Sequence, residues 1–189
     1  MRYKAFLNNQ LAELKHVDVP ALNEKEWKPV KLGSLFENYH GRRLVKENRK
    51  KGNIPLLTAN SVNNGVAEFI GNDDMNTYSD FVSVDMFCNT FVHPYIATGD
   101  DNIYFFKNDD LSVYAKHFIC TCISKQQNKF SYGKQFRQQN ADNLLIMLPI
   151  TDIGEPDWAY MEQYAKNLML KKYQQYLGFL DGQQAKADN

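Results

Sequence analysis

The sequence predicts a mixed α/β fold (α+β), in which one globular domain of short strands and few helices is followed by a long C-terminal helix. Three observations support this prediction. Short apolar runs typical of strands alternate with turn residues through the middle of the chain. Before the C-terminal part of this region, only the segment 113–124 has the length and pattern of a substantial helix. After a turn that contains Gly154 and Pro156, one helical pattern continues without a break to about Leu180.

Residues 1–24 are predicted to form a short helix and a connector. The helix covers the first ~16 residues, because apolar side chains recur there at helical spacing. These side chains are Phe6, Leu7, Leu11 and Leu14. The connector, 17–24, contains Pro20.

Residues 25–153 are predicted to form the globular domain. It begins with a short strand at Trp27, which leads into a one-turn helix at 32–36. Asn64 and Gly65 form the dipeptide that is the strongest short-range signal of a β-hairpin. The remaining predicted elements are strands at 54–59, 81–84, 90–92, 103–106 and 144–148, and a helix at 113–124.

Residues 154–182 are predicted to form the long helix, and 183–189 a disordered tail. Pro156 suits the first turn, where its missing donor costs nothing. At ~1.5 Å per residue, ~25–28 residues extend roughly 40 Å, which exceeds what is needed to cover a small domain. We therefore expect pairing with a helix of another molecule rather than packing on the same domain alone. The predicted pairing positions are Trp158, Met161, Ala165, Leu168, Tyr173, Leu177 and Leu180.

Composition and cysteine usage are typical of a cytoplasmic globular protein. Of the 189 residues, 43% are hydrophobic and 23% charged. No apolar run approaches the ~18–20 residues of a membrane span, and the N-terminus lacks the apolar stretch of a signal peptide. The three cysteines, Cys88, Cys120 and Cys122, form no disulfide framework or zinc pattern, so we expect buried structural thiols.

The charges are strongly segregated along the chain although the net charge is zero. Residues 40–51 hold six basic residues against one acid, a local charge of +5. Residues 125–137 hold four basic residues and no acid, or +4, whereas 68–110 hold nine acids against one lysine, or −8. Such a chain presents a basic face if the acidic block folds to another side. Alternatively, each basic block is only a solvated loop.

The two basic blocks also contain side chains suited to nucleic-acid contacts. Arginine pins phosphates or pairs with guanine, and glutamine matches the edge of adenine. Gly41 would give flexibility beside Arg42 and Arg43. The predicted contact residues are Arg42, Arg43, Lys46, Arg49, Lys50, Lys51, Lys129, Lys134, Gln135, Arg137 and Gln138.

Catalytic motifs are not found in the sequence. A methyltransferase needs a Gly-rich cofactor loop and an amine-gripping Asn/Asp-Pro-Pro-aromatic loop, and neither occurs. The Asp73–Asp74 and Asp100–Asp101 pairs are typical of turns rather than of a magnesium site. The four histidines show no ligand spacing, and no Ser or Cys stands in a nucleophile motif. We therefore predict no catalytic residue and no metal ligand.

Several ordered blocks resemble the target recognition domain of specificity subunits in type I restriction–modification systems. The first is Trp27-x-x-Val30-x-Leu32-Gly33, followed by the Ile54–Ala59 block. The closing block, Leu148-Pro149-Ile150 with Gly154-x-Pro156-Asp157-Trp158, is the most specific. The resemblance covers about 27–163.

The resemblance implies a non-catalytic subunit that binds double-stranded DNA and assembles with an adenine-N6 methyltransferase and often a restriction subunit. S-adenosylmethionine, Mg²⁺ and ATP would then belong to those partners, and this chain would hold no cofactor. Because one recognition domain and one long helix are present, we expect a homodimer through the C-terminal helix that reads a split palindromic site. Two alternatives remain: the recognition part of a nuclease or methyltransferase, and an adaptor that binds partners through the helix.

Overall fold

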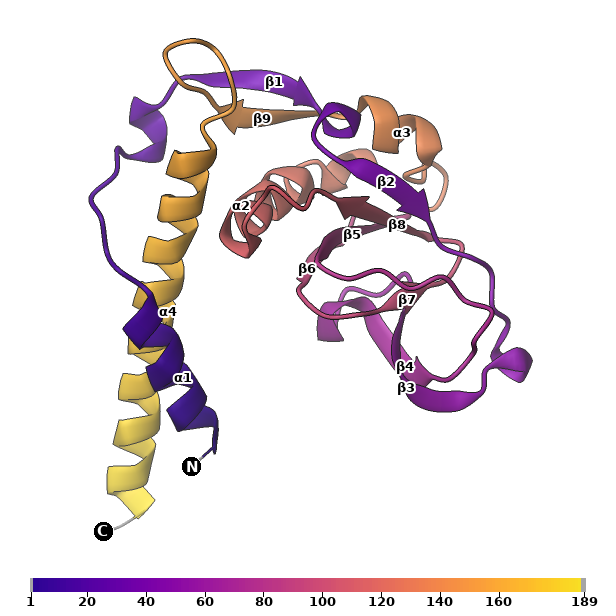
Figure 1. The fold of residues 1–189 in the computed structure, drawn as a ribbon, viewed down its shortest axis with the longest axis horizontal. Coiled ribbons are helices and arrows are strands. Elements are labelled where there is room, and N and C mark those ends of the chain that lie inside the picture. The colour runs from indigo at the N-terminus through magenta and orange to yellow at the C-terminus, as the bar shows by residue number, and fades with distance from the viewer. Residues whose placement is uncertain (1, 188–189) are drawn as a thin grey trace.

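The computed structural model describes the backbone of residues 2–187 and the side chains of residues 4–183, and it confirms the predicted fold class (Figure 1). The helices are α1 (Arg2–Glu13), α2 (Val113–Ser124), α3 (Gln138–Asn143) and α4 (Trp158–Ala187). The strands are β1 (Trp27–Lys31), β2 (Glu37–His40), β3 (Lys51–Leu57), β4 (Val66–Ile70), β5 (Phe81–Asp85), β6 (Thr90–His93), β7 (Thr98–Gly99), β8 (Ile103–Lys107) and β9 (Leu145–Pro149).

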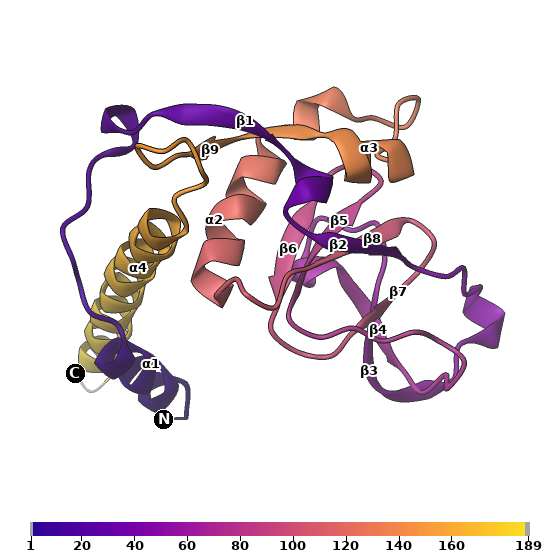
Figure 2. The same ribbon diagram turned by 45° about the horizontal axis from the view of Figure 1, so that its top comes forward.

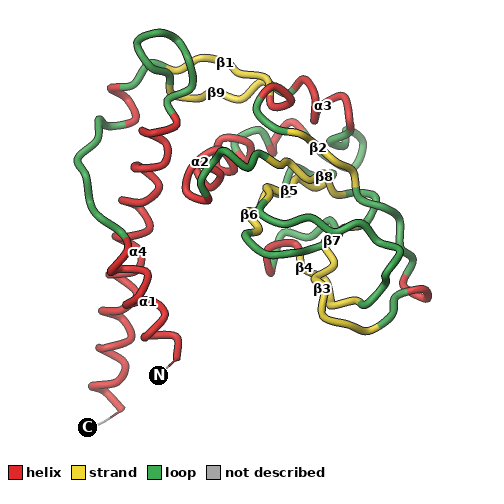
Figure 3. The backbone as a smooth tube through the Cα atoms, viewed as in Figure 1, coloured by secondary structure: helices red, strands yellow, loops and turns green. Residues whose placement is uncertain are grey.

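The strands form three small sheets. The largest is antiparallel, with the order β2-β8-β5-β6, and a second sheet has the order β4-β3-β7. In the third, β1 pairs with β9 in antiparallel register from Trp27↔Pro149 to Lys31↔Leu145. Figure 3 shows this ribbon running from the top of α4 to the other sheets. The β1–β9 ribbon thus connects the long helix to the globular part.

The main core lies between the four-stranded sheet and α2. Ser112 caps α2, its hydroxyl accepting from the backbone N–H of Ala115 at 3.2 Å. The helix then buries Phe118, Ile119 and Ile123. The three thiols pack in or against this core, and burial raises the pKa of Cys88 and Cys122 to about 12 and that of Cys120 to about 11. The prediction of structural cysteines agrees with this packing.

The start of α4 differs from the prediction. The Asp157 carboxylate accepts from the backbone N–H of Tyr160 at 3.1 Å, so it caps a helix that begins at Trp158. Pro156 therefore precedes the cap, where it forms a bridge with Ile150. Lys25 pairs with Asp157 at 2.7 Å, which ties the helix start to the segment just before β1. At the other end the helix continues through Ala187, beyond the predicted end at 182; residues 188 and 189 of the predicted tail lie outside the described residues.

Helix α1 lies alongside α4, with the two ends of the chain close together (Figures 1 and 2). Lys4 pairs with Asp181, while the amide of Gln163 donates to the carbonyl of Lys15 at 3.0 Å. These contacts make the two helices antiparallel. Leu7 of α1 and Leu14, which directly follows the helix, are buried.

The intramolecular packing overturns part of the predicted pairing seam. Met161 and Ala165 are buried in the chain's own structure, and Trp158 packs against the main core. Because Met161 and Ala165 are buried, they are not available to a helix of another molecule, whereas Trp158 is only partly buried. Leu168 remains 47% exposed.

The predicted Asn-Gly turn is present in a longer connection than a two-residue hairpin. Asn64 has φ 53° and Gly65 has φ 76°, the left-handed geometry that this dipeptide favours. Yet β3 ends at Leu57, so residues 58–65 all belong to the loop before β4. Strands β2 and β7 and helix α3 were not predicted.

None of the helices in the described part of the chain combines the length and the apolar character needed to cross a membrane.

Candidate nucleic-acid interface

The first basic segment is fixed against the sheet rather than flexible. The backbone N–H of Gly41 donates to the carbonyl of Ile103 at 2.9 Å, and that of Arg42 donates to the carbonyl of Gly99 at 3.1 Å. A Cβ atom on Gly41 would lie 2.0 Å from the carbonyl oxygen of Asp100. Glycine is therefore required here by the close approach of two backbone segments, which corrects the expectation of a flexible position.

Replacing Gly41 by alanine is expected to destabilise the protein by roughly 1–3 kcal/mol, because the clash is with backbone that must shift. Urea denaturation followed by circular dichroism measures this change. The matched control is Gly133→Ala, since nothing lies within 4 Å of a Cβ built there. Equal stabilities of the two variants would show that the Gly41 contact is easily relaxed.

Two arginines of this segment lie beside acids of residues 68–110, so the acidic block does not fold wholly to another side. Arg42 lies 3.3 Å from the Asp74 carboxylate, and Arg43 lies 3.8 Å from that of Asp101. Both arginine side chains stay largely exposed, at 61% and 76%. Exposed pairs of this kind contribute only ~0–1 kcal/mol, so either guanidinium can exchange its carboxylate for a phosphate.

Arg49 has a structural position. Its side chain is only 18% exposed, donates to the carbonyl of Leu44 at 3.2 and 3.3 Å, and pairs with Glu68. It therefore holds the loop onto β4 and does not face solvent as a contact residue would. Lys46, Lys50 and Lys51 are exposed.

The second basic segment follows α2. Lys129 ends a single 3-10 turn, and Lys134 and Gln135 lie in the exposed or half-exposed loop before α3. Arg137 donates to the side chain of Gln135. Gln138 donates to Asn38 at 2.7 Å and to Asp142 at 3.0 Å, so its amide links α3 to β2.

A ring stack connects the two basic segments. His40 stacks on Tyr104 with ring centroids 4.5 Å apart, and its Nε2 lies 2.8 Å from the carbonyl oxygen of Asp101. Burial raises the pKa of the Tyr104 phenol, and the Arg137 guanidinium at its hydroxyl partly offsets this rise. Successive contacts therefore link Arg137, Tyr104, His40, Asp101 and Arg43, with the buried Tyr104 ring beneath the exposed His40.

We call these five residues, together with the two basic segments, the basic strip. Sequence reasoning missed the linking residues His40, Tyr104 and Asp101. His40 belongs to the unpredicted strand β2, whose register places it opposite Tyr104. The sequence carries no local signal for this link, because 103–107 is nearly continuous apolar sequence and β2 is polar.

A Ser–His pair is present but inaccessible. Ser83 Oγ lies 2.8 Å from His93 Nε2, and both residues are buried. Burial lowers the pKa of His93 to about 4, and its other ring nitrogen faces the Tyr95 hydroxyl at 3.1 Å. Because a substrate cannot reach this pair, it supports packing of β5 on β6 rather than nucleophilic chemistry.

Among the described side chains of residues 4–183, no group of three His, Cys, Asp or Glu residues could hold a metal ion.

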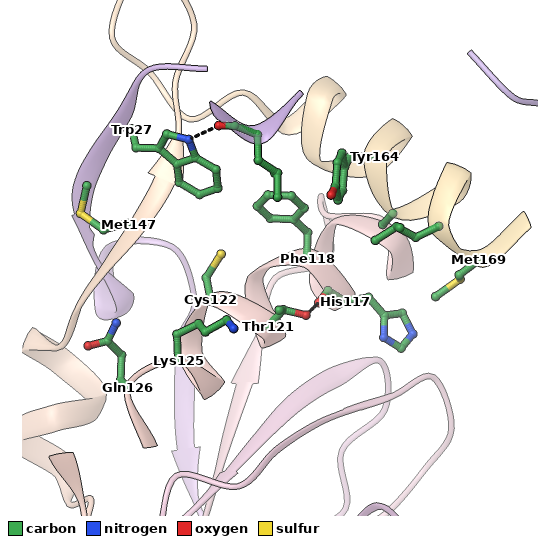
Figure 4. Close-up of a pocket in the computed structure, with 13 residues that line it drawn as sticks. Trp27, His117, Phe118, Thr121, Cys122, Lys125, Gln126, Met147, Tyr164 and Met169 are labelled. Carbon is green, nitrogen blue, oxygen red and sulfur yellow. Dashed lines mark hydrogen bonds between the residues drawn. The ribbon is translucent and has the colours of Figure 1, made fainter. Parts of the chain in front are cut away.

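An apolar groove of about 540 Å³ lies between α2 and α4 (Figure 4). Phe118 and Tyr164 line it, and Trp27 closes one side, where its indole N–H donates to the carbonyl of Leu22 at 2.9 Å. Leu168, one of the predicted pairing positions, also lines this groove.

Comparison with known proteins agrees with this arrangement. Residues 24–176 match the family described as type I restriction modification DNA specificity domain. The chain is 30% identical over 152 residues to the type II restriction enzyme specificity subunit S.BcgI of Heyndrickxia coagulans, covering 78% of this chain and 45% of that protein.

Solved structures show the same fold. The S subunit of a type I restriction–modification system from M. genitalium superposes with a TM-score of 0.56 at 15% identity, covering 96% of this chain and 46% of that one. The HsdS subunit from Thermoanaerobacter tengcongensis gives 0.53 at 16% identity, covering 97% and 48%. The chain thus spans about half the length of the relatives it matches.

Proposed function

The chain belongs to the type I restriction modification DNA specificity domain family, and we propose that it is the sequence-specific DNA-binding component of a restriction–modification system. The observation that carries the proposal is the family match over residues 24–176. Specificity subunits are non-catalytic. In this proposal residues 25–153 read the DNA, and residues 1–24 and 154–182 serve assembly.

The basic strip supports the proposed DNA contact. Its exposed arginines and lysines suit phosphate oxygens, which provide most of the affinity in protein–DNA complexes. Gln135, Asn38 and Gln138 place amide groups near the second segment, and amides match the edge of adenine in the major groove. We propose the named basic residues as phosphate contacts, with Arg49 as a structural exception.

The proposed partners follow from the same family. The chain would direct an adenine-N6 methyltransferase to a split target site and would also associate with a restriction subunit. S-adenosylmethionine, Mg²⁺ and ATP would be bound by those partners.

The DNA-binding proposal is tested by affinity as a function of salt. Binding of a fluorescent duplex should weaken steeply with salt concentration, because phosphate contacts release counterions. Replacing Arg42 and Arg43 by alanine should abolish most binding at physiological salt and lower the salt slope by about two. Lys171→Ala/Lys172→Ala is the matched control, since it removes two exposed positive charges from α4.

Salt-independent binding by the complex with the methyltransferase, or no binding at all, would contradict the proposal. Magnesium-dependent cleavage by the chain alone would instead indicate an enzyme. Capture of a helical partner without DNA affinity would indicate an adaptor.

We further propose that two copies associate through α4. Gln163, Asn167 and Asp181 contact α1 and the residues that follow it. They share one helical face with Leu170 and Leu177, at spacings of three, four or seven residues. In this proposal Leu177 faces α1 rather than the seam between the two molecules. A second stripe with the same spacing contains Met169, Tyr173, Tyr176 and Leu180.

The second stripe suits a symmetric helix pair. It lies beside Phe179, which is 57% exposed and stacks on Tyr176 with ring centroids 6.0 Å apart. In a two-fold dimer each copy would present the same stripe to the other. Such a dimer would read a palindromic split site.

A further inference from the structure

The loop between α2 and α3 contains a narrow projecting turn. Ser131 and Lys134 exchange two backbone hydrogen bonds, at 3.0 and 3.1 Å, which close a turn with Tyr132 and Gly133 at its tip. The Tyr132 side chain is 83% exposed. Nothing lies within 4 Å of a Cβ atom built on Gly133. We call residues 129–137 the arm.

The base of the arm is fixed in the core. Phe136 is fully buried, and its backbone N–H donates to the carbonyl of Met86 at 2.9 Å. Phe130 packs on Phe136 with ring centroids 5.3 Å apart, so the two sides of the arm are held together at its base. A preformed arm loses little conformational entropy when it binds a ligand.

The arm is also positively charged without nearby compensation. The arm contains Lys129, Lys134 and Arg137, Lys125 lies shortly before it, and residues 125–137 contain no acid. Within the described side chains, none of these four forms an ion pair with a carboxylate, whereas Arg42, Arg43 and Arg49 each have an acidic neighbour. A polyanion therefore meets an unscreened positive field at this loop.

A single exposed aromatic residue is common and needs no explanation. Here the ring stands at the tip of a rigid, uniformly basic arm, and the three properties together suit one ligand. The major groove of B-DNA, about 12 Å wide, admits a two-stranded ribbon, whereas the minor groove of about 6 Å does not. Apolar side chains read thymine there through its C5 methyl group.

We propose that the arm enters the major groove and that the Tyr132 ring packs on base edges, with a thymine methyl group as the preferred contact. Lys129 and Lys134 then face the phosphates that flank the groove. This inference rests on the proposed DNA-binding function and deepens it, because it assigns a base-reading contact to a residue that carries no charge.

The first test compares Tyr132→Ala, Tyr132→Phe and Lys134→Ala. The target is obtained by selection from duplexes with a randomised centre, using the full chain with the methyltransferase of its system. Tyr132→Ala should weaken binding about tenfold and leave the salt slope unchanged, because a neutral contact is lost. Tyr132→Phe should retain the affinity, and Lys134→Ala should lower the slope by about one.

The second test locates the ring in the groove. Each thymine of the selected duplex is replaced in turn by 5-iodo-2′-deoxyuridine, whose iodine occupies the position of the methyl group. Irradiation followed by mass spectrometry of peptides should give a cross-link at Tyr132 for one or two positions of the duplex.

The two proposals can fail separately. Wild-type binding with unchanged affinity in Tyr132→Ala and no cross-link at Tyr132 would overturn the arm contact and leave the DNA-binding function standing. Absence of any duplex binding by the wild-type complex would overturn both. Because Tyr132 is exposed, Tyr132→Ala should keep the wild-type melting temperature. If its melting temperature is lower, DNA affinity is measured well below that temperature, where the variant is folded.

Discussion

Replacing Phe136 by alanine is expected to lower the free energy of unfolding by roughly 3–5 kcal/mol, the largest single stability effect that we predict. Phe136 is fully buried and contacts three aromatic rings. Its centroid lies 5.3 Å from that of Tyr104 and from that of Phe130, and 6.4 Å from that of Phe106. Truncation leaves a cavity among rigid rings that cannot collapse into it.

Equilibrium urea denaturation measures this loss. The matched control is Phe69→Ala, because Phe69 is 56% exposed and its removal should change the stability far less. Phe136→Ala should also weaken DNA binding at temperatures where the protein stays folded, since Phe136 links the base of the arm to Tyr104. A loss below about 1 kcal/mol would show that the rings repack and that the arm is not fixed by this residue.

The elements that the sequence predicts well are those whose pattern is local. Helix α2 begins and ends where predicted because Ser112 caps an apolar segment of helical length. Strands β5 and β8 are likewise short apolar runs that become fully buried or nearly so. Burial of such runs is favourable in any arrangement of the neighbours.

The elements that the sequence does not predict depend on distant partners. Strand β2, Glu37–His40, has a polar sequence and exists because its backbone pairs with β8. Helix α3 is short and polar, with Ala141 as its buried residue. Tertiary contacts decide both, so local periodicity carries no signal for them.

The same distinction applies to the candidate site. Local charge located two basic segments, but it could not show that Asp74 and Asp101 return to the side of Arg42 and Arg43. It also could not separate Arg49, which supports the loop, from its exposed neighbours. Which charges face solvent is a property of the folded chain, and the proposed contacts must be judged by exposure.

Replacing Leu180 by glutamate is expected to convert a dimeric chain into a monomer. Leu180 belongs to the second stripe of α4. Since each copy in a two-fold dimer carries the substitution, the dimer would bury two carboxylates. Burying an unpaired charge is strongly unfavourable, so the dissociation constant should rise by on the order of a hundredfold or more. Sedimentation velocity over a range of concentrations measures the change.

Two matched variants separate pairing from folding. Leu180→Met keeps an apolar side chain of similar volume and should remain dimeric. Gln175→Glu adds the same charge at an exposed position of α4 outside the stripe and should also remain dimeric. A dimeric Leu180→Glu chain would contradict the proposed pairing face.

The DNA that each form binds then distinguishes assembly from base reading. The monomeric Leu180→Glu variant keeps its basic strip, so it should bind a single half-site as the wild type does. It should lose the added affinity for two half-sites in one duplex, because that gain requires two linked copies. If the monomer instead bound the split site as tightly as the wild type, α4 would not be the link between two DNA-reading domains. The helix would then serve to bind a different subunit.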